Sequence, residues 1–288
     1  VWTTSSGQPS IEILQEAKLA EMARRLATRL TEPFGIINAD ARQSSPSPAV
    51  NCILKGFDAR RTMLPGDFAA ARSCLRQLIE QDPGFYPAWA HLALLTFGEG
   101  GSGQERQAPQ STEASGSPPL DRPLAAAFTA VRLAPASARA DQAVMKVLFL
   151  RGASEEAVQR GREALERNPY DPEIMSDLGS VLIRIGRAEE GLPLVERAIA
   201  LSVGRPARYD FYAFLGAYLT GAKVSEACAA ALAADTTPFG LLAQALIAAS
   251  EGDHARQAAA ARELAEKAPL FGSDPRAYLS RRGFAPEV

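Results

Sequence analysis

The sequence holds few residues of the kinds that perform nucleophilic or metal-assisted chemistry. It has two histidines, His91 and His254. His91 stands beside Trp89 in an apolar stretch, and His254 follows a Gly-Asp turn signal. Neither belongs to a Ser–His–Asp, Cys–His or HExxH arrangement, and no GxGxxG or GxxxxGK[ST] motif occurs. We therefore expect no enzyme activity, no catalytic residue, no cofactor and no metal site in this chain.

Cysteine usage gives no second route to chemistry. Cys52, Cys74 and Cys228 lie far apart and show no CxxC or zinc-ligand spacing. Their odd number argues against a disulfide framework, and we expect them to be single buried thiols.

Composition excludes several classes of partner. Lysine and arginine number 31 against 33 acids, for a net charge of −2. This balance gives no electrostatic reason to expect nucleic acid or an anionic membrane surface as a partner. Apolar residues make up 47% of the chain, which is typical of a folded soluble protein, but no apolar run reaches the roughly 18 residues of a membrane span.

Glycine and proline recur along the chain at one fixed separation. A glycine precedes a proline by 17 positions at Gly66 and Pro83, Gly152 and Pro169, Gly221 and Pro238, and Gly252 and Pro269. Gly186 follows Gly152 by 34 positions and leads to Val203 in place of a proline. A period near 34 residues is typical of tetratricopeptide repeats (TPRs), each of which is a helix, a tight turn and a second helix. The sequence predicts an all-α fold, an α-solenoid of stacked helix-turn-helix repeats that forms a right-handed superhelix.

The residues inside the period fit this architecture. Ile174, Leu178 and Leu182 follow helical spacing after Pro169. Gly179 stands where two helices must approach closely, and Gly186 ends that helix, where a residue without Cβ takes a left-handed cap.

Segments outside the period predict the domain organisation. Residues 1–10 are expected to be a tail or the remnant of an upstream domain. Residues 11–50 predict a long amphipathic helix, with an apolar stripe over Ile11–Leu30, and a connector. The solenoid is expected over 51–288, with an insertion at 98–123 whose Gly, Ser, Pro and Gln content predicts a flexible loop.

Three stretches follow one another in the first third of the chain: "LQEAKLAEMARRLATRLTEPFGIINADAR", "CILKGFDARR" and "FAAARSCLRQLIEQDPGFYPAWAHLALL". In this order they resemble the C-terminal sensory region of certain bacterial regulators. These are class III adenylate/guanylate cyclases and winged-helix transcription activators in which a TolB-like module precedes TPRs. The resemblance runs from about Ile11 onward and is most specific over Leu14–Arg42 and in the stretch "DPGFYPAWAHLA". It implies a sensory repeat module, whose cyclase or DNA-binding output domain lies outside this chain.

Stacked repeats create a concave groove lined by the first helix of each repeat, and such grooves bind extended peptides or partner helices. Counting from the proline that ends each repeat assigns side chains of two consecutive first helices to this groove. These candidate partner-binding residues are Arg139, Gln142, Lys146, Phe149, Glu173, Ser176, Ser180 and Arg184. Clamps for the C-terminal carboxylates of chaperones present Lys and Asn at matching positions, where only Lys146 fits, so we do not expect that ligand.

Two functional hypotheses follow. The first is a non-catalytic protein- or peptide-binding module, the sensory or scaffolding part of a bacterial signalling regulator. The alternative is a self-association module, in which either the stacked ends of the solenoid or the long N-terminal helix pairs two chains into a homodimer. The expected partner is thus a protein or peptide in the groove, or a second copy, and not nucleic acid. The sequence is compatible with a cytoplasmic or a periplasmic part of a larger protein.

Overall fold

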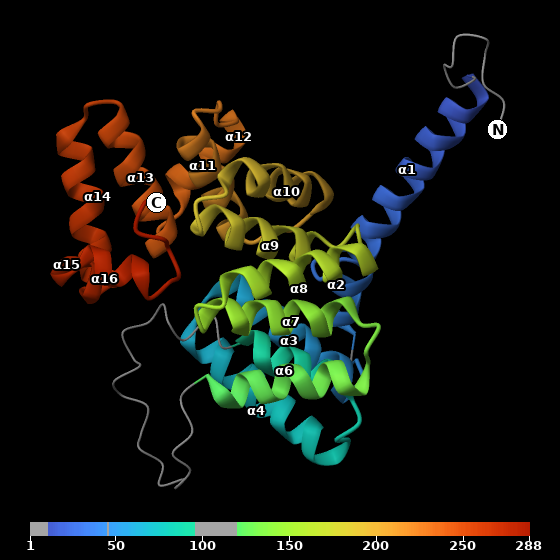
Figure 1. Ribbon diagram of the computed structural model, residues 1–288. Helices are drawn as coiled ribbons and strands as arrows, with labels where there is room; N and C mark the ends of the chain where they lie inside the picture. Colours follow the sequence, from blue (N-terminus) through green and yellow to red (C-terminus); the bar gives the residue numbers. More distant parts are fainter. Residues whose placement is uncertain (1–10, 45, 96–119) are drawn as a thin grey trace, which may run out of the picture.

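Antiparallel helix pairs follow one another along the chain (Figure 1). The computed structural model describes residues 11–44, 46–95 and 120–288, and every regular element in these ranges is a helix. The pairs are α3 (Pro48–Thr62) with α4 (Pro65–Gln81), α5 (Tyr86–Leu94) with α6 (Asp121–Leu133), α7 (Ala138–Leu150) with α8 (Ser154–Arg167), α9 (Pro172–Arg184) with α10 (Ala188–Leu201), α11 (Ala207–Thr220) with α12 (Glu226–Ala234), and α13 (Pro238–Ser250) with α14 (His254–Lys267). We call the odd-numbered member of each pair its first helix.

The turns inside the pairs use the predicted glycines, with one exception. Gly152, Gly186, Gly221 and Gly252 follow first helices with φ of +82°, +83°, +71° and +73°. Such values cost little only where no Cβ is present. Gly66 differs, because it lies inside α4; the left-handed residue of that pair is Met63, with φ of 57°.

Close approach of α9 to α10 explains a glycine of the repeat pattern. A Cβ on Gly179 would lie 2.7 Å from the carbonyl oxygen of Gly191 and 2.7 Å from a methyl group of Val195. The prediction that a side chain at Gly179 would hold these helices apart is confirmed.

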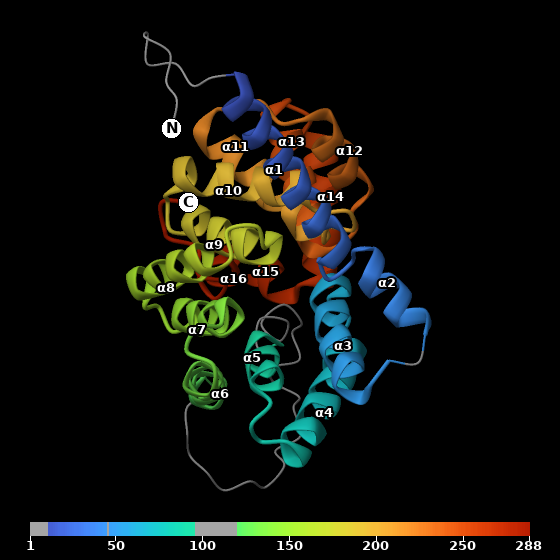
Figure 2. The ribbon, with the colours of Figure 1, turned by 90° about the vertical axis from the view of Figure 1, so that its right-hand side faces the viewer.

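The elements at the two ends differ from the repeats. At the N-terminal side, α1 (Ile11–Thr31) extends away from the solenoid and α2 (Ile36–Gln43) follows it (Figures 1 and 2). At the other end, the short helices α15 (Pro269–Ser273) and α16 (Pro275–Ser280) pack beneath α13 and α14. The predicted insertion at 98–123 falls largely outside the described residues, and α6 already begins at Asp121.

The first helix of the solenoid begins earlier than the sequence pattern suggested. It starts at Pro48 instead of Asn51, because the Ser47 side chain caps it by accepting a hydrogen bond from the Val50 amide.

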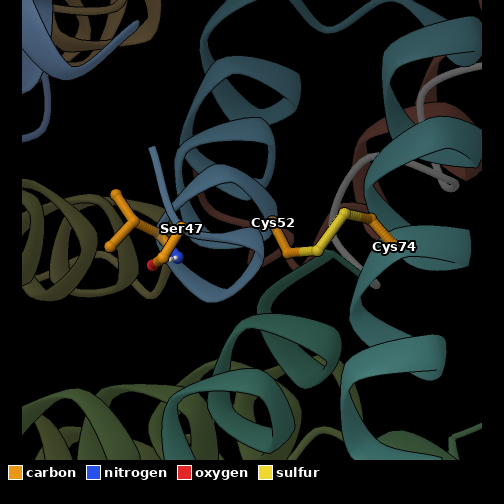
Figure 3. The surroundings of a disulfide bond; sticks show 4 residues. Ser47, Cys52 and Cys74 are labelled. Carbon is orange, nitrogen blue, oxygen red and sulfur yellow. Dashed lines mark hydrogen bonds between the residues drawn. A yellow bond between two sulfur atoms is a disulfide. The ribbon is translucent and has the colours of Figure 1, made fainter. Parts of the chain in front are cut away.

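The prediction of three single thiols was wrong for two of them. Cys52 on α3 and Cys74 on α4 form a disulfide, with Cα atoms 5.4 Å apart (Figure 3). Antiparallel pairing of the two helices brings these residues face to face although 22 positions separate them. Cys228, the third, is a free buried thiol.

No single helix of the described residues is long and apolar enough to cross a membrane. Together α12 and α13 meet that length and composition, but they are bent by 119°.

Candidate functional site: the inner face of the first helices

Helices α7 and α9 bring the eight predicted residues together on one face. We call this face, formed by Arg139, Gln142, Lys146 and Phe149 of α7 with Glu173, Ser176, Ser180 and Arg184 of α9, the inner face. It is not an open groove. Seven of these residues are at most 5% exposed, and Arg139 alone is partly exposed. Other segments of the chain cover the inner face, and partner binding by these residues stays a prediction.

A buried carboxylate stands at the centre of the inner face. Asp177 of α9 accepts hydrogen bonds from Lys146 Nζ at 2.9 Å and from Gln142 Nε2 at 2.7 Å. It also accepts one from Nη2 of Arg60, on α3, at 2.7 Å. Three repeats therefore converge on one anion, and the Arg60 side chain lies buried against the inner face.

Glu173 extends this cluster to α11. Its carboxylate accepts hydrogen bonds from Arg208 Nη2 at 2.8 Å and from the Tyr209 hydroxyl at 2.8 Å, and it lies 3.0 Å from Arg60. Arg208 also donates to the carbonyl oxygen of Arg60 at 2.7 Å. The contacts join α3, α9 and α11 across the inside of the solenoid.

Burial and neighbouring charges act in opposite directions on the pKa values of this cluster. Burial would raise the pKa of Asp177, but Lys146 and Arg60 outweigh it and hold that pKa below its ordinary range. The pKa of Glu173 is lowered in the same way, since Arg208 and Arg60 overcome its burial. Burial lowers the pKa of Lys146 to about 7 against the attraction of Asp177. Both carboxylates are thus charged at neutral pH, as their bonds to cations require.

A polar cavity opens at the N-terminal end of the inner face. Its volume is about 180 Å³, and it lies between the α1–α2 connection and the starts of α7 and α9. Arg139 lines it, 2.5 Å from Asp171 and stacked on the ring of Phe57 at 5.3 Å. Opposite, Glu32 accepts a hydrogen bond from the Val203 amide, and burial raises its pKa.

The C-terminal end of the inner face carries a segment of the chain itself, residues 281–288. The guanidinium of Arg184 stacks on Phe149 at 4.2 Å and donates a 2.7 Å hydrogen bond to the carbonyl oxygen of Arg282. The Ala285 amide donates to the carbonyl oxygen of Arg184 at 2.8 Å. Phe284 is buried in the core formed by α9, α10 and α11.

The sequence pattern missed Arg60, Asp177 and Arg208. A signal existed for Asp177, because an acid in the apolar stretch "IMSDLGSVLI" four positions after Glu173 occupies the same helix face. No comparable signal marked Arg60 or Arg208.

The histidine in α5 is a core residue. Its ring meets that of Phe57 edge to face, with centroids 4.6 Å apart, and burial, with Arg139 and Arg60 nearby, lowers the pKa of His91 well below its usual value. Within the described ranges, no group of three or more His, Cys, Asp or Glu side chains could hold a metal ion.

No protein-family model matches this sequence, and no curated protein matches it. Solved structures with similar folds include Cut9 in the APC/C hetero-tetramer Cut9–Hcn1, at 17% identity and a TM-score of 0.55, over 91% of this chain and 47% of that chain. A monomeric mutant of IFIT1 with m7Gppp-AAAA matches at 15% identity and a TM-score of 0.54, over 75% of this chain and 50% of that chain. A tetratricopeptide repeat protein from Parabacteroides merdae matches at 16% identity and a TM-score of 0.46, over 82% of this chain and 84% of that chain. The match spans about half the length of the Cut9 and IFIT1 chains. The fold is the predicted all-α TPR-like solenoid.

Proposed function

We propose that this chain is a non-catalytic repeat module that binds a protein or an extended peptide along its inner face. The observation that carries the proposal is the contact of residues 281–288 with Phe149 and Arg184. Two of the predicted binding residues thus already hold a stretch of non-helical chain, by hydrogen bonds to its backbone and by an aromatic contact.

Such contacts suit a peptide ligand. Main-chain hydrogen bonds are available to any peptide, while a buried aromatic anchor gives affinity and selectivity. Cut9, a protein with a similar fold, forms a hetero-tetramer with Hcn1. The proposed role of this chain, binding another protein, resembles that assembly.

Photo-crosslinking tests this role. Benzoylphenylalanine replaces Tyr170, which lines the cavity beside Arg139, or Phe128, a 45% exposed aromatic on α6, as the matched control. In a lysate of the source cell, one defined protein should crosslink at position 170 and not at 128, and an Arg139→Ala change should reduce that product. Equal products at both positions, or a product at 128 alone, would count against binding at the inner face.

The module's place in a larger protein belongs to the same proposal. Similarity of 14–42 to the junction before the repeats of bacterial cyclases and transcription activators supports a sensory or scaffolding part of a signalling regulator. Disulfides persist in oxidising compartments, so the Cys52–Cys74 bond favours a periplasmic over a cytoplasmic placement. Mass spectrometry of protein alkylated in intact cells without reductant tests this point, since a cytoplasmic chain would be alkylated at both cysteines.

A second candidate function, self-association, rests on α1. Leu19, Met22 and Leu26 are 69%, 67% and 60% exposed and recur at helical spacing on α1, which extends from the solenoid (Figure 1). Pairing with a second copy would cover this stripe.

Light scattering distinguishes the candidates. Under self-association the chain elutes as a dimer, and Leu19→Glu with Leu26→Glu makes it a monomer. Leu133→Glu, at a 39% exposed leucine of α6, serves as the control and leaves the dimer intact. A monomeric parent chain would rule this candidate out.

A further inference from the structure

We propose that residues 281–288 are a displaceable ligand of the inner face, and that a partner peptide with glycine followed by an aromatic residue takes their place. This inference rests on the proposed function and adds to it the chemistry of the ligand. It also implies that the unaltered chain is held in a self-occupied state, so that a partner must compete with the chain's own segment.

The glycine requirement comes from two independent constraints at Gly283. Its φ is +76°, which an L side chain adopts only with strain. A Cβ added there would also overlap the Phe149 ring. Gly252 has nearly the same φ, +73°, but nothing within 4 Å of the added atom. The fit of Gly283 against Phe149 is therefore a contact with the inner face and not merely a helix cap.

The aromatic requirement comes from the next residue. Phe284 is 9% exposed and joins the core beside Ile183 and Tyr212. By contrast the side chains of Arg281, Pro286 and Glu287 are exposed, while Val288 is partly buried against the same core as Phe284. The inner face thus contacts a backbone turn and its glycine, and the adjoining core of α9, α10 and α11 holds the ring that follows.

The segment contacts the inner face and the core through a small number of groups. It follows α15 and α16, helices of five and six residues, and Arg184 hydrogen-bonds to the backbone of Arg282 and Ala285. Val288 packs against the same core as Phe284, and Arg282 stacks on Tyr278 of α16 at 3.5 Å. A short peptide can supply one buried ring, one partly buried valine and two hydrogen bonds in trans, which makes exchange of one segment for the other feasible.

Two substitutions in the full chain release the segment by different routes. Gly283→Ala introduces the overlap with Phe149, and Phe284→Ala removes the buried ring, while both leave the inner face unchanged. Gly252→Ala is the matched control, because it imposes the same backbone strain without a neighbour. Hydrogen exchange at the Ala285 amide reports release, and circular dichroism reports that the helices are retained.

The probe is a fluorescein-labelled peptide with the sequence of residues 279–288, measured by anisotropy. Both release variants should bind it at least about tenfold more tightly than the unaltered chain or Gly252→Ala, since they no longer compete intramolecularly. The same peptide carrying Phe284→Ala should not bind. Faster exchange at Ala285 without peptide binding, or unchanged exchange in both variants, would make the segment an integral part of the fold and overturn the proposal. Since no foreign partner is used, this failure would leave a crosslink at position 170 standing as evidence for the proposed function.

Discussion

Arg60 and Asp177 lie 117 positions apart, yet the Arg60 Nη2 donates a 2.7 Å hydrogen bond to the Asp177 Oδ2. Their side chains are 5% and 2% exposed. The pair joins α3, at the start of the solenoid, to α9 in its middle, so the first helices close around a shared charge cluster. Ion pairs fill the centre of the inner face. We therefore propose ligand contacts at its two ends, at the partly exposed Arg139 and, once residues 281–288 are displaced, at Arg184.

Removing the central charge should destabilise the fold strongly. Asp177→Asn leaves Arg60 and Lys146 buried without their shared anion, and breaking such a buried pair costs about 3–5 kcal/mol. Urea unfolding at pH 7 measures the loss. Glu251→Gln is the control, because Glu251 and its partner Arg256 are 54% and 53% exposed and such a pair contributes about 1 kcal/mol or less. Equal losses in the two variants would show that the cluster does not tie the repeats together.

Acid should weaken the fold through the same carboxylates. The folded-state pKa values of Asp177 and Glu173 lie below those of the unfolded chain, which are about 4. Below about pH 4 the unfolded state therefore binds more protons, and the free energy of unfolding falls as the pH drops. Urea midpoints between pH 6 and 2.5 should show this fall, with a shallower slope in Asp177→Asn. The difference between the two slopes isolates the contribution of Asp177 from that of Glu32. The pKa of Glu32 is raised, so Glu32 changes the free energy of unfolding with pH in the opposite direction. Parallel slopes would contradict the lowered pKa of Asp177.

Reduction of the disulfide should lower stability by about 3 kcal/mol, the loop-closure value for a separation of 22 residues. Thermal unfolding with and without dithiothreitol measures this. The reductant should have no effect on a chain with both Cys52→Ala and Cys74→Ala, and Cys228→Ala should leave the response to reductant unchanged. A parent chain insensitive to reductant would mean that the bond does not constrain the unfolded state.

Two glycine-to-alanine changes should act in opposite directions. Gly179→Ala forces α9 away from Gly191 and Val195, and overpacking of this kind costs about 1–3 kcal/mol. Gly66→Ala lies in α4 with nothing within 4 Å of the new Cβ, so it should stabilise by about 0.5–1 kcal/mol. Denaturant unfolding of both variants tests whether Gly179 has a packing role and whether Gly66 lies in an uncrowded first turn of α4.

Local signals in the sequence were enough to predict the repeats. Glycines such as Gly186 and the apolar spacing around Leu178 are set within one helix pair, so they can be recognised without knowing how pairs stack. The close approach at Gly179 was predictable for the same reason.

Contacts between distant repeats were not predictable in this way. The register assigned Lys146 and Arg184 to the inner face, but whether that face is open depends on how the superhelix closes. Closure places Arg60 and residues 281–288, which are far apart in the sequence, against the inner face. The spacing of residues within one repeat does not predict contacts of this kind. The Cys52–Cys74 bond was not predicted because it depends on how α3 and α4 align. The number and spacing of the cysteines give no information about that alignment.

Hydrogen exchange at the Ala285 amide of the unaltered chain tests the central claim most directly. The unlabelled peptide of residues 279–288 is added on the order of millimolar, the range needed to compete with a tethered ligand. We predict faster exchange at Ala285, whose amide bonds to Arg184, and no change at Ala268, whose amide bonds to Leu264 of α14. Unchanged exchange at Ala285, or equal acceleration at both amides, would contradict a displaceable ligand on the inner face.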